Sequence, residues 1–468
     1  MQYTSVSDLL ADARSCLQLT NGSVKVNDAQ RFREQLLDKL VHSAVFGDQD
    51  VKAAARWLIW EAAWELGVKS ASIDSLYQAR SRDAYQGVTV PAINVRGMAY
   101  DTARAVVRAV HARKVGPFIF ELARSEMGYT DQTCDEFATV VTAASLREGY
   151  SGPIFIQGDH YQANAKRYQA DPEKEIEGLR KLVREAVAAG YGNIDIDSST
   201  LVDLSRSSLS EQQRDNYERC AEVATLIREL EQSGVTISIG GEIGEVGKKN
   251  STVEELDAYM DGFNRVFAEK VGGGVRGLSK ISVNTGSTHG GVVLPDGTIA
   301  KVKIDFDTLR AMSDEARKYG LGGAVQHGAS TLPAEAFHRF PETGTLEVHL
   351  ATEFQNIAMD HPSFPPELRE EIRQFAFREL AEERGSDDTD EQFVYKARKK
   401  AWGPFKQQVW EMDSSARGQI SRTLEEKFEF LYDQLGVTNT RHLVEQHIQP
   451  AKIAKPQPEA VKAVAAGS

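Results

Sequence analysis

The chain has 468 residues, of which 41% are hydrophobic and 26% charged, and its formal net charge is −13. This length and composition are typical of a large globular core with extensions, and they exclude a small binding module. The acidic balance disfavours binding to a nucleic-acid backbone, which requires clustered Lys and Arg side chains.

The sequence carries the signals of a cytoplasmic protein. The start of the chain lacks a basic segment followed by an apolar run, and nowhere do the roughly 18 apolar residues of a membrane span follow one another. The three cysteines, Cys16, Cys134 and Cys220, are far apart and outside any CxxC spacing. We therefore expect no membrane attachment and no disulfide framework, in a reducing cytoplasm.

Residues 1–85 are expected to form a helical N-terminal extension. They include the apolar and aromatic segment VKAAARWLIWEAAWELGV, which begins at Val51. A helix that is apolar on most of its sides needs a partner surface. We expect this helix to pack against the rest of the chain or against another subunit, and not to bind a ligand.

From Val88 onward, short apolar segments rich in β-formers alternate with amphipathic helical patterns, which is typical of βα units and a parallel sheet. Eight segments are predicted as strands: residues 88–95, 117–122, 152–160, 193–199, 236–244, 280–290, 323–330 and 345–353. Eight βα units predict an α/β fold, a (β/α)8 TIM barrel over residues 86–360. Active sites of such barrels lie at the C-terminal ends of the strands.

Residues 361–468 are expected to form a helical C-terminal extension. Charged helical patterns begin after Pro362, and the chain ends in AKIAKPQPEAVKAVAAGS, whose Ala, Pro and Lys content favours a flexible tail.

Three histidines stand near the ends of predicted strands: His160, His289 and His327. Three imidazoles from distant parts of the sequence could meet at one rim of a barrel and hold a zinc ion, which takes three or four N, O or S ligands. Glu242 lies among glycines at the end of the fifth strand and could approach the same metal. A salt bridge in a surface loop is the alternative for Glu242.

Asp159 directly precedes His160 and could act as an acid or base toward a substrate while His160 holds the ion. Neighbouring side chains on a strand point to opposite faces, so both can serve one site only if the chain turns there.

Glycines and hydroxyl side chains that suit a phosphate follow the later strands: Gly290, Gly328, Ser330 and Thr352. Backbone N–H groups can approach an anion closely at glycine, and barrels often bind phosphate beyond the seventh and eighth strands. Glycines that only form turns are the alternative. His349, on the eighth strand, could face the barrel interior.

The ordered motifs resemble the class II, metal-dependent ketose-bisphosphate aldolases, which include fructose- and tagatose-bisphosphate aldolases. The resemblance covers about Val88 to Asn356 through VPAINV, GDH, NIDIDSS, GEIG, NTGSTHGG, VQHGAS and VHLATEFQN. It implies a zinc-dependent lyase of carbohydrate metabolism, such as glycolysis, that cleaves a phosphorylated ketose reversibly to dihydroxyacetone phosphate and an aldehyde. A homo-oligomer, dimer or tetramer, is expected on the same ground.

The resemblance also implies roles for single residues. His160, His289 and His327 match the zinc ligands, and Glu242 matches an additional or alternating ligand. Asp159 matches the proton donor and acceptor at the aldehyde-derived hydroxyl, and Glu245 is the nearest candidate for the acid at the enediolate carbon. The remaining matches are to substrate and phosphate contacts: Asn94, Ser125, Gly290, Gly328, Ser330, His349 and Thr352.

Departures from the family leave the substrate open. His349 stands where the family usually has Asn, and Ala351 stands where fructose-bisphosphate enzymes have Asp. The ligand types also suit other divalent metals such as cobalt or iron, and a monovalent cation could join them. The alternative functions are a metal-dependent barrel hydrolase or isomerase that activates water, and a non-catalytic aldolase relative.

Overall fold

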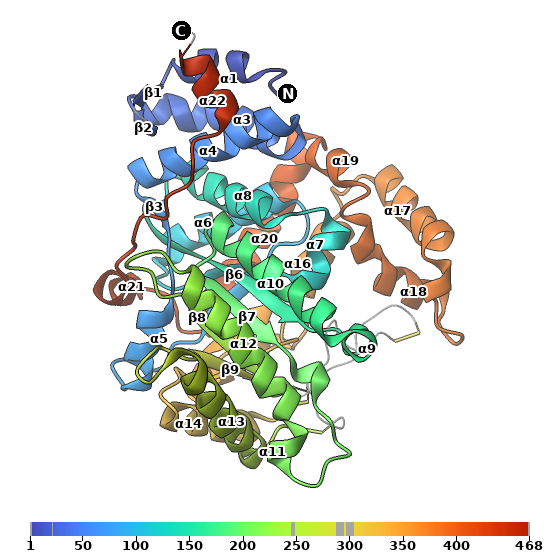
Figure 1. The fold of residues 1–468 in the computed structure, drawn as a ribbon. Coiled ribbons are helices and arrows are strands. Elements are labelled where there is room, and N and C mark those ends of the chain that lie inside the picture. The colour runs from blue at the N-terminus through green and yellow to red at the C-terminus, as the bar shows by residue number, and fades with distance from the viewer. Residues whose placement is uncertain (1, 21, 245–248, 287–293, 296–303, 467–468) are drawn as a thin grey trace.

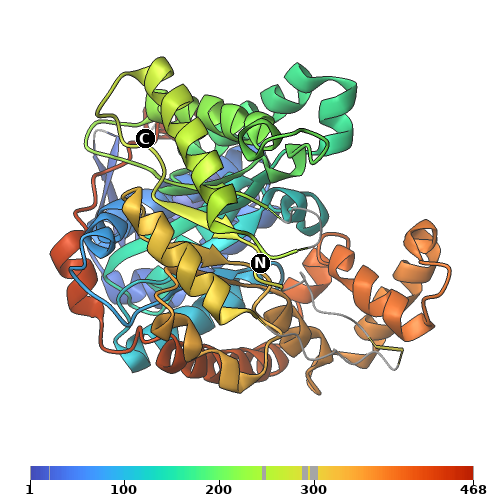
Figure 2. The same cartoon turned by 90° about the horizontal axis from the view of Figure 1, so that it is seen from below.

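A computed structural model describes residues 2–20, 22–244, 249–286, 294–295 and 304–466 of the chain. A barrel of parallel strands occupies its middle and helices surround it (Figure 1). The N-terminal helices gather at the top of the molecule in Figure 1, and the helices of residues 366–397 stand out from the side of the barrel (Figures 1 and 2).

In the described part of the chain, eight parallel strands close a barrel, with the order β4-β5-β6-β7-β8-β9-β10-β11 and β11 pairing back to β4. Their bounds are β4 Val90–Asn94, β5 Ile119–Ala123, β6 Gly152–Gln162, β7 Asn193–Asp197, β8 Ser238–Glu242, β9 Lys280–Val283, β10 Ala324–Gln326 and β11 Glu347–Leu350. Each lies within or overlaps one of the eight predicted segments. The predicted TIM barrel is confirmed.

Amphipathic helices cover the outside of the barrel. The long ones that follow strands are α6 Ala99–Arg113, α8 Cys134–Arg147, α10 Pro172–Ala189, α12 Arg214–Leu230, α13 Val253–Val271, α14 Phe306–Lys318 and α16 Thr352–Asp360. Helix α10 shows the pattern: it buries Ile176, Leu179, Val183 and Ala186, three or four residues apart, and turns most of its charged side chains outward. Shorter helices lie in the loops: α7 Arg124–Thr130, α9 Ala165–Ala170, η2 Ser199–Leu201, α11 Leu209–Gln212, η3 Ala334–Ala336 and α15 Arg339–Glu342.

The N-terminal extension is mainly helical but also contains strands. Its elements are α1 Val6–Ala13, β1 Leu17–Thr20, β2 Ser23–Val26, α2 Ala29–Arg31, η1 Phe32–Leu36, α3 Leu37–Phe46, α4 Gln49–Glu65, β3 Val68–Ser70 and α5 Asp74–Ser81. The alternating segments LQLT and SVKV pair as an antiparallel hairpin, and β3 adds to β6 beside the barrel. The apolar segment forms α4, which packs against α3 and α8 and buries Trp57 and Ile59, as expected.

The C-terminal extension wraps back over the barrel. It consists of α17 Pro366–Glu379, η4 Ala381–Glu383, α18 Asp390–Ala397, η5 Arg398–Ala401, α19 Lys406–Trp410, α20 Ser414–Gln434, α21 Arg441–His447 and α22 Glu459–Ala466. Helix α20 packs along α6 and buries Ile420, Leu424 and Phe428.

Contrary to the expectation of a flexible tail, the described residues after Pro450 pack against the N-terminal extension, where α22 lies beside α1 (Figure 1). Trp60 Nε1 donates a hydrogen bond to the Ile453 carbonyl over 3.1 Å, and Lys455 Nζ lies 3.9 Å from the Trp60 ring centre. Val461 is fully buried. Composition alone did not reveal that the exposed side of α4 offers this tail an aromatic partner.

Within the described chain, every helix is too short or too polar to span a lipid bilayer.

Candidate metal and substrate site

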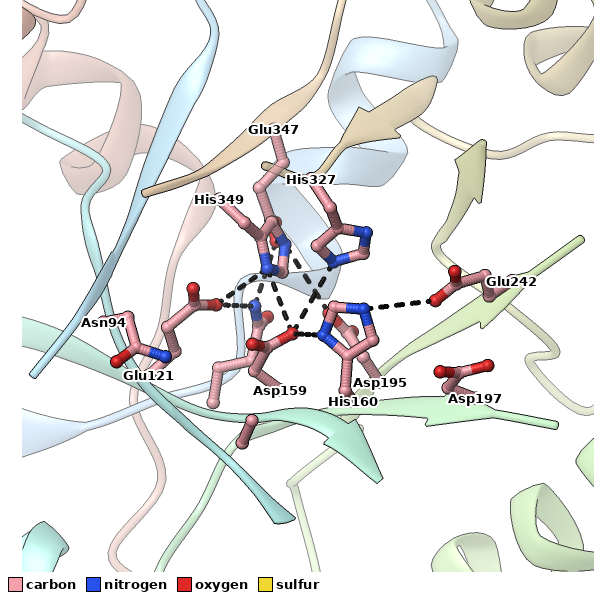
Figure 3. A network of polar contacts seen from close by, with 12 residues as sticks. Asn94, Glu121, Asp159, His160, Asp195, Asp197, Glu242, His327, Glu347 and His349 are labelled. Carbon is pink, nitrogen blue, oxygen red and sulfur yellow. Dashed lines mark hydrogen bonds and ion pairs between the residues drawn. The ribbon is translucent and has the colours of Figure 1, made fainter. Parts of the chain in front are cut away.

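An irregularity in β6 turns Asp159 and His160 toward the same space. The pairing of β6 with β7 shifts register between Gly158 and Tyr161. His160 has a backbone φ of 40°, which residues other than glycine rarely adopt. Both side chains therefore reach the mouth of the barrel, where His160 Nδ1 lies 2.6 Å from Asp159 Oδ1 (Figure 3). Backbone strain of this kind is characteristic of functional sites.

A histidine and carboxylate cluster gathers at this end of the barrel. His160 Nε2 lies 3.6 Å from Glu242 Oε2, and the ring centres of His160 and His327 are 4.0 Å apart. His160, Glu242 and His327 each offer one ligand atom, and these atoms all lie within 4.8 Å of one another. Nitrogen and oxygen donors this close fit a divalent metal. The structure thus brings together three of the four predicted ligands.

The electrostatics of Glu242 also favour a bound cation. Burial, reinforced by the nearby carboxylate of Asp197, raises the pKa of Glu242 to about 8. A carboxylate desolvated in this way is held ionised at neutral pH only if positive charge lies beside it. The His160 imidazole lies beside Glu242, and a metal ion held by these three side chains would add positive charge.

Asp159 stands among three imidazoles. Besides His160, it has His327 Nε2 at 3.6 Å and His349 Nδ1 at 3.2 Å from Oδ1 (Figure 3). Burial alone would raise the pKa of Asp159, but the neighbouring imidazoles, His160 foremost, lower it well below its usual range. The Asp159 side chain is therefore an ionised carboxylate.

Below this cluster, the barrel interior holds a buried network of charged side chains. Lys280 Nζ lies 3.0 Å from Asp195 Oδ2 and also pairs with Glu347. Gln157 Nε2 donates to both Glu121 and Glu347, over 3.1 and 3.0 Å. Such a layer replaces the branched aliphatic side chains that usually fill a TIM barrel.

A second group of potential ligands, formed by Asp195, Glu347 and His349, is not a metal site. Its atoms are as close together as those of the first group. The Lys280 ammonium, however, already lies between the two carboxylates. Gly240 leaves room for it, because a Cβ there would lie 2.3 Å from Asp195 Oδ1 and 3.0 Å from Lys280 Cε.

His349 links the network to the site. Its Nε2 lies 2.7 Å from Glu347 Oε1, and its Nδ1 lies 3.0 Å from Glu121 Oε2. Burial lowers the pKa of His349, but Glu121 and Asp159 together raise it well above the usual value. His349 therefore faces the barrel interior, as the sequence suggested, and also contributes to the cavity wall.

A cavity of about 640 Å³ opens above Asp159 and His160. This volume suits a small-molecule ligand. Four cationic side chains line it: Arg96, Arg124, Arg167 and Lys399. Among the described residues, two carboxylates form ion pairs with them. Glu126 pairs with Arg96 at 2.7 Å, and Glu175 pairs with both Arg124 and Arg167, at 2.6 and 2.8 Å. An acidic chain thus presents a locally positive wall, which suits an anionic ligand.

The predicted substrate contacts divide into three sets. Ser125, Gly328, Ser330, His349 and Thr352 line the cavity. Asn94 is 2% exposed and donates from Nδ2 to Glu126 Oε2 over 2.5 Å, so it holds a residue of the cavity wall. Gly290 lies outside the described residues, as do the predicted acid Glu245 and the predicted metal ligand His289.

Sequence reasoning missed the interior network and the cationic wall. The network had a signal: Glu121, Asp195, Lys280 and Glu347 are charges within otherwise apolar strands. A buried charge needs a partner, so four of them on inward positions indicate a shared network. The cavity cations gave no such signal, because Arg and Lys in loops and extensions are usually solvated.

The barrel and its histidine and carboxylate cluster define a (β/α)8 protein with a candidate metal site. The family model described as fructose-bisphosphate aldolase class-II matches residues 76–431, and the chain belongs to that family. The search of curated proteins gave no match.

Solved structures share the fold at low sequence identity. A fructuronate-tagaturonate epimerase, UxaE, from Cohnella laeviribosi superposes with a TM-score of 0.54 at 13% identity, covering 90% of this chain and 94% of its own. A Sinorhizobium meliloti protein described as a probable tagatose 6 phosphate kinase gives 0.53 at 16% identity, covering 81% and 98%. The fructose-bisphosphate aldolase of Campylobacter jejuni gives 0.46 at 16% identity, covering 80% and 98%.

Proposed function

We propose that the protein is a metal-dependent aldolase that cleaves a phosphorylated ketose into dihydroxyacetone phosphate and an aldehyde. The observation that carries the proposal is the position of Asp159: an ionised carboxylate beside the candidate metal ligands His160 and His327, at the floor of a cavity lined with cations.

His160, Glu242 and His327 would hold the metal, with His289 as the predicted further ligand. When bound, a divalent metal polarises the ketose carbonyl and stabilises the negative charge that develops there. Zinc fits the donor set, and so do other divalent ions with the same ligand preference.

Asp159 would move the proton at the bond that breaks. Its carboxylate takes the proton from the hydroxyl on the carbon of the scissile bond that lies farther from the ketose carbonyl. The oxygen of that hydroxyl forms the aldehyde C=O as the carbon–carbon bond breaks, and the bonding electron pair stays on the ketose-derived half as an enediolate. That half then takes a proton on carbon to give dihydroxyacetone phosphate, for which Glu245 remains the predicted acid.

The phosphate would bind where Ser330 and Thr352 line the cavity beside Gly328. The Ser330 hydroxyl sits at the start of α16, where it accepts a hydrogen bond from the Glu353 N–H over 3.4 Å. Hydroxyl donors next to a helix N-terminus suit a phosphate. Gly290 is predicted to complete this cradle.

A product assay tests the proposal. Metal-loaded protein is incubated with fructose 1,6-bisphosphate, tagatose 1,6-bisphosphate and the corresponding 1-phosphates. Release of dihydroxyacetone phosphate is followed with glycerol-3-phosphate dehydrogenase, and chelation should abolish it. If no phosphorylated ketose yields this product while metal is bound, the aldolase proposal is wrong.

A second candidate is epimerisation of a ketose, in which the same bond breaks and re-forms on the other face of the aldehyde. It is supported by the C-terminal extension lining the cavity through Lys399, because an enclosed aldehyde can rebind before it escapes. The superposition with the Cohnella epimerase covers 90% of this chain, which is more than the barrel alone. NMR of the products separates the two functions, since an epimerase returns a six-carbon ketose and no three-carbon product.

Metal content gives a prediction that does not depend on the substrate. We expect His327→Ala and Glu242→Ala each to weaken metal binding by at least about 10–100-fold, the loss that follows even from removing an outer-shell partner. Metal per chain is measured by mass spectrometry after dialysis. His442→Ala, which changes an exposed histidine on α21, is the control. Full metal content in both site variants would contradict the assignment.

A further inference from the structure

The C-terminal extension contributes a side chain to the cavity. Lys399 belongs to η5, 49 residues beyond the end of β11 at Leu350, yet it lines the same cavity as Asp159 and His160. Helix α7, which follows β5, packs against η5. The cavity wall is thus completed by a segment outside the barrel.

The backbone next to Lys399 is fixed firmly to the barrel. Trp402 is 3% exposed, and its ring fills the space beside Gly97, where a Cβ would lie 2.3 Å from it. Trp402 Nε1 donates to Gln355 Oε1 over 3.1 Å, and the Gly403 N–H donates to the Tyr129 carbonyl over 2.8 Å. Contacts of Trp402 and Gly403 with the regions of β4, α7 and α16 therefore hold the backbone of Lys399 in place.

Positive charge at this part of the wall is only partly neutralised. Lys399 forms no ion pair with a carboxylate in the described part of the chain, and its Nζ lies 6.0 Å from the Tyr129 ring centre. Arg96 pairs with Glu126, but Arg96 Nε is buried without a hydrogen-bond partner among the described residues. Burial, and then the nearby Arg96, lower the pKa of Lys399. Glu126 pairs with Arg96 and leaves Lys399 without an ion pair among the described residues, so a further anion beside Lys399 would be favourable.

These cations occupy a sector of the rim that adjoins the proposed phosphate cradle, because β4 and β11 are neighbouring strands. Arg96 follows β4, and α7, on which Lys399 packs, follows β5. Ser330 and Thr352 follow β10 and β11. A ketose bound at the cradle with its carbonyl at the metal ligands would extend its other end along the cavity.

Building on the proposed function, we propose that Lys399 and Arg96 bind a second anionic group of the substrate, a phosphate or a carboxylate, and that the C-terminal extension thereby selects which ketoses enter the site. A charge-assisted hydrogen bond from an ammonium to either anion is stronger than a neutral one. Glu126 holds Arg96 for this role through its ion pair.

Binding of non-cleavable probes to the metal-loaded, full-length protein tests this inference. Hexitols lack the carbonyl and stay intact. One pair is a hexitol 1,6-bisphosphate and the matching hexitol 1-phosphate, and the other pair is a hexonate and the matching hexitol. Each pair differs by one anionic group, and calorimetry gives the Kd of each member for the wild-type chain, Lys399→Met, Lys399→Arg and Lys400→Met.

For one of the two pairs, we expect the wild-type chain to bind the probe with the extra anion more tightly than its partner. Lys399→Met should raise the Kd of the more charged probe about ten-fold or more and leave the Kd of its partner unchanged. Lys399→Arg should restore most of the preference. Lys400→Met should behave as wild type, because Lys400 pairs with Glu383 at 2.5 Å. The pair that responds identifies the second group as phosphate or carboxylate.

Three results would overturn the inference: no preference for either charged member in the wild-type chain, an unchanged preference in Lys399→Met, or an equal loss for both members of a pair. Melting temperatures establish that the variants are folded. Since binding is measured without turnover, a chain that shows the expected preference but cleaves no ketose would refute the proposed aldolase and leave this inference standing.

Discussion

Asp159→Asn is expected to lower turnover by about 10²–10⁴-fold, the range typical of losing a positioned acid or base. Asparagine keeps the shape of the side chain but cannot take the hydroxyl proton. The candidate metal ligands His160 and His327 remain, so metal per chain should stay close to that of the wild type. Initial rates in the product assay and metal content, measured on the same preparation, check both statements.

A second buried carboxylate provides the control. Glu121 lies 3.0 Å from His349 Nδ1, as Asp159 lies 3.2 Å from it. If Asp159 acted only by orienting His349, Glu121→Gln would reduce turnover to a similar extent. We expect Glu121→Gln to retain much more activity than Asp159→Asn. Equal losses, or loss of metal in Asp159→Asn, would show that Asp159 has a positioning or metal-binding role.

Lys280→Met should destabilise the fold by about 3–5 kcal/mol, because it leaves the buried carboxylates of Asp195 and Glu347 without their ammonium partner. Lys280 is fully buried. Burial lowers its pKa, but Asp195 and Glu347 raise the pKa above its usual value, which fits an ammonium held between carboxylates. The shift in the urea unfolding midpoint, followed by circular dichroism, measures the effect.

Two further variants show whether unpaired charge is the cause. Lys318→Met removes a lysine that pairs with Glu315 on the surface of α14, and it should leave the midpoint unchanged. Adding Glu347→Gln to Lys280→Met should recover part of the lost stability, because one stranded carboxylate becomes neutral. If the double variant loses more free energy of unfolding than the two single variants lose together, the ion pair is not the source of the stability.

The barrel could be predicted from the sequence because each strand carries a short apolar segment bounded by turn residues, and helical patterns separate the strands. The barrel strand Val90–Asn94 is buried at every position, which leaves a strong signal. The hairpin of β1 and β2 was missed, since LQLT and SVKV are short and lie between helical segments. The packed tail was also missed, because Ile453 in the tail bonds to Trp60, which lies almost 400 residues earlier in the sequence.

For the site, proximity of His160, Glu242 and His327 could be predicted, since all three lie near the carboxyl ends of parallel strands that share one rim. The way Asp159 joins them could not, because it depends on the backbone of His160, whose φ of 40° no residue pattern indicates. Lys399 was also beyond sequence reasoning. The position of Lys399 depends on the packing of Trp402 against Gly97, two residues about 300 positions apart in the sequence.

The way α20 lies along α6 has a consequence for dissecting the chain. Residues 86–360 contain all eight barrel strands and would be the natural choice for a minimal expressed fragment. Cut out in this way, the cylinder would expose to water the flank that Ile420, Leu424 and Phe428 now cover, and would lose one side of its binding chamber. A fragment of the barrel designed for expression or crystallography must therefore include the carboxyl-terminal hundred or so residues.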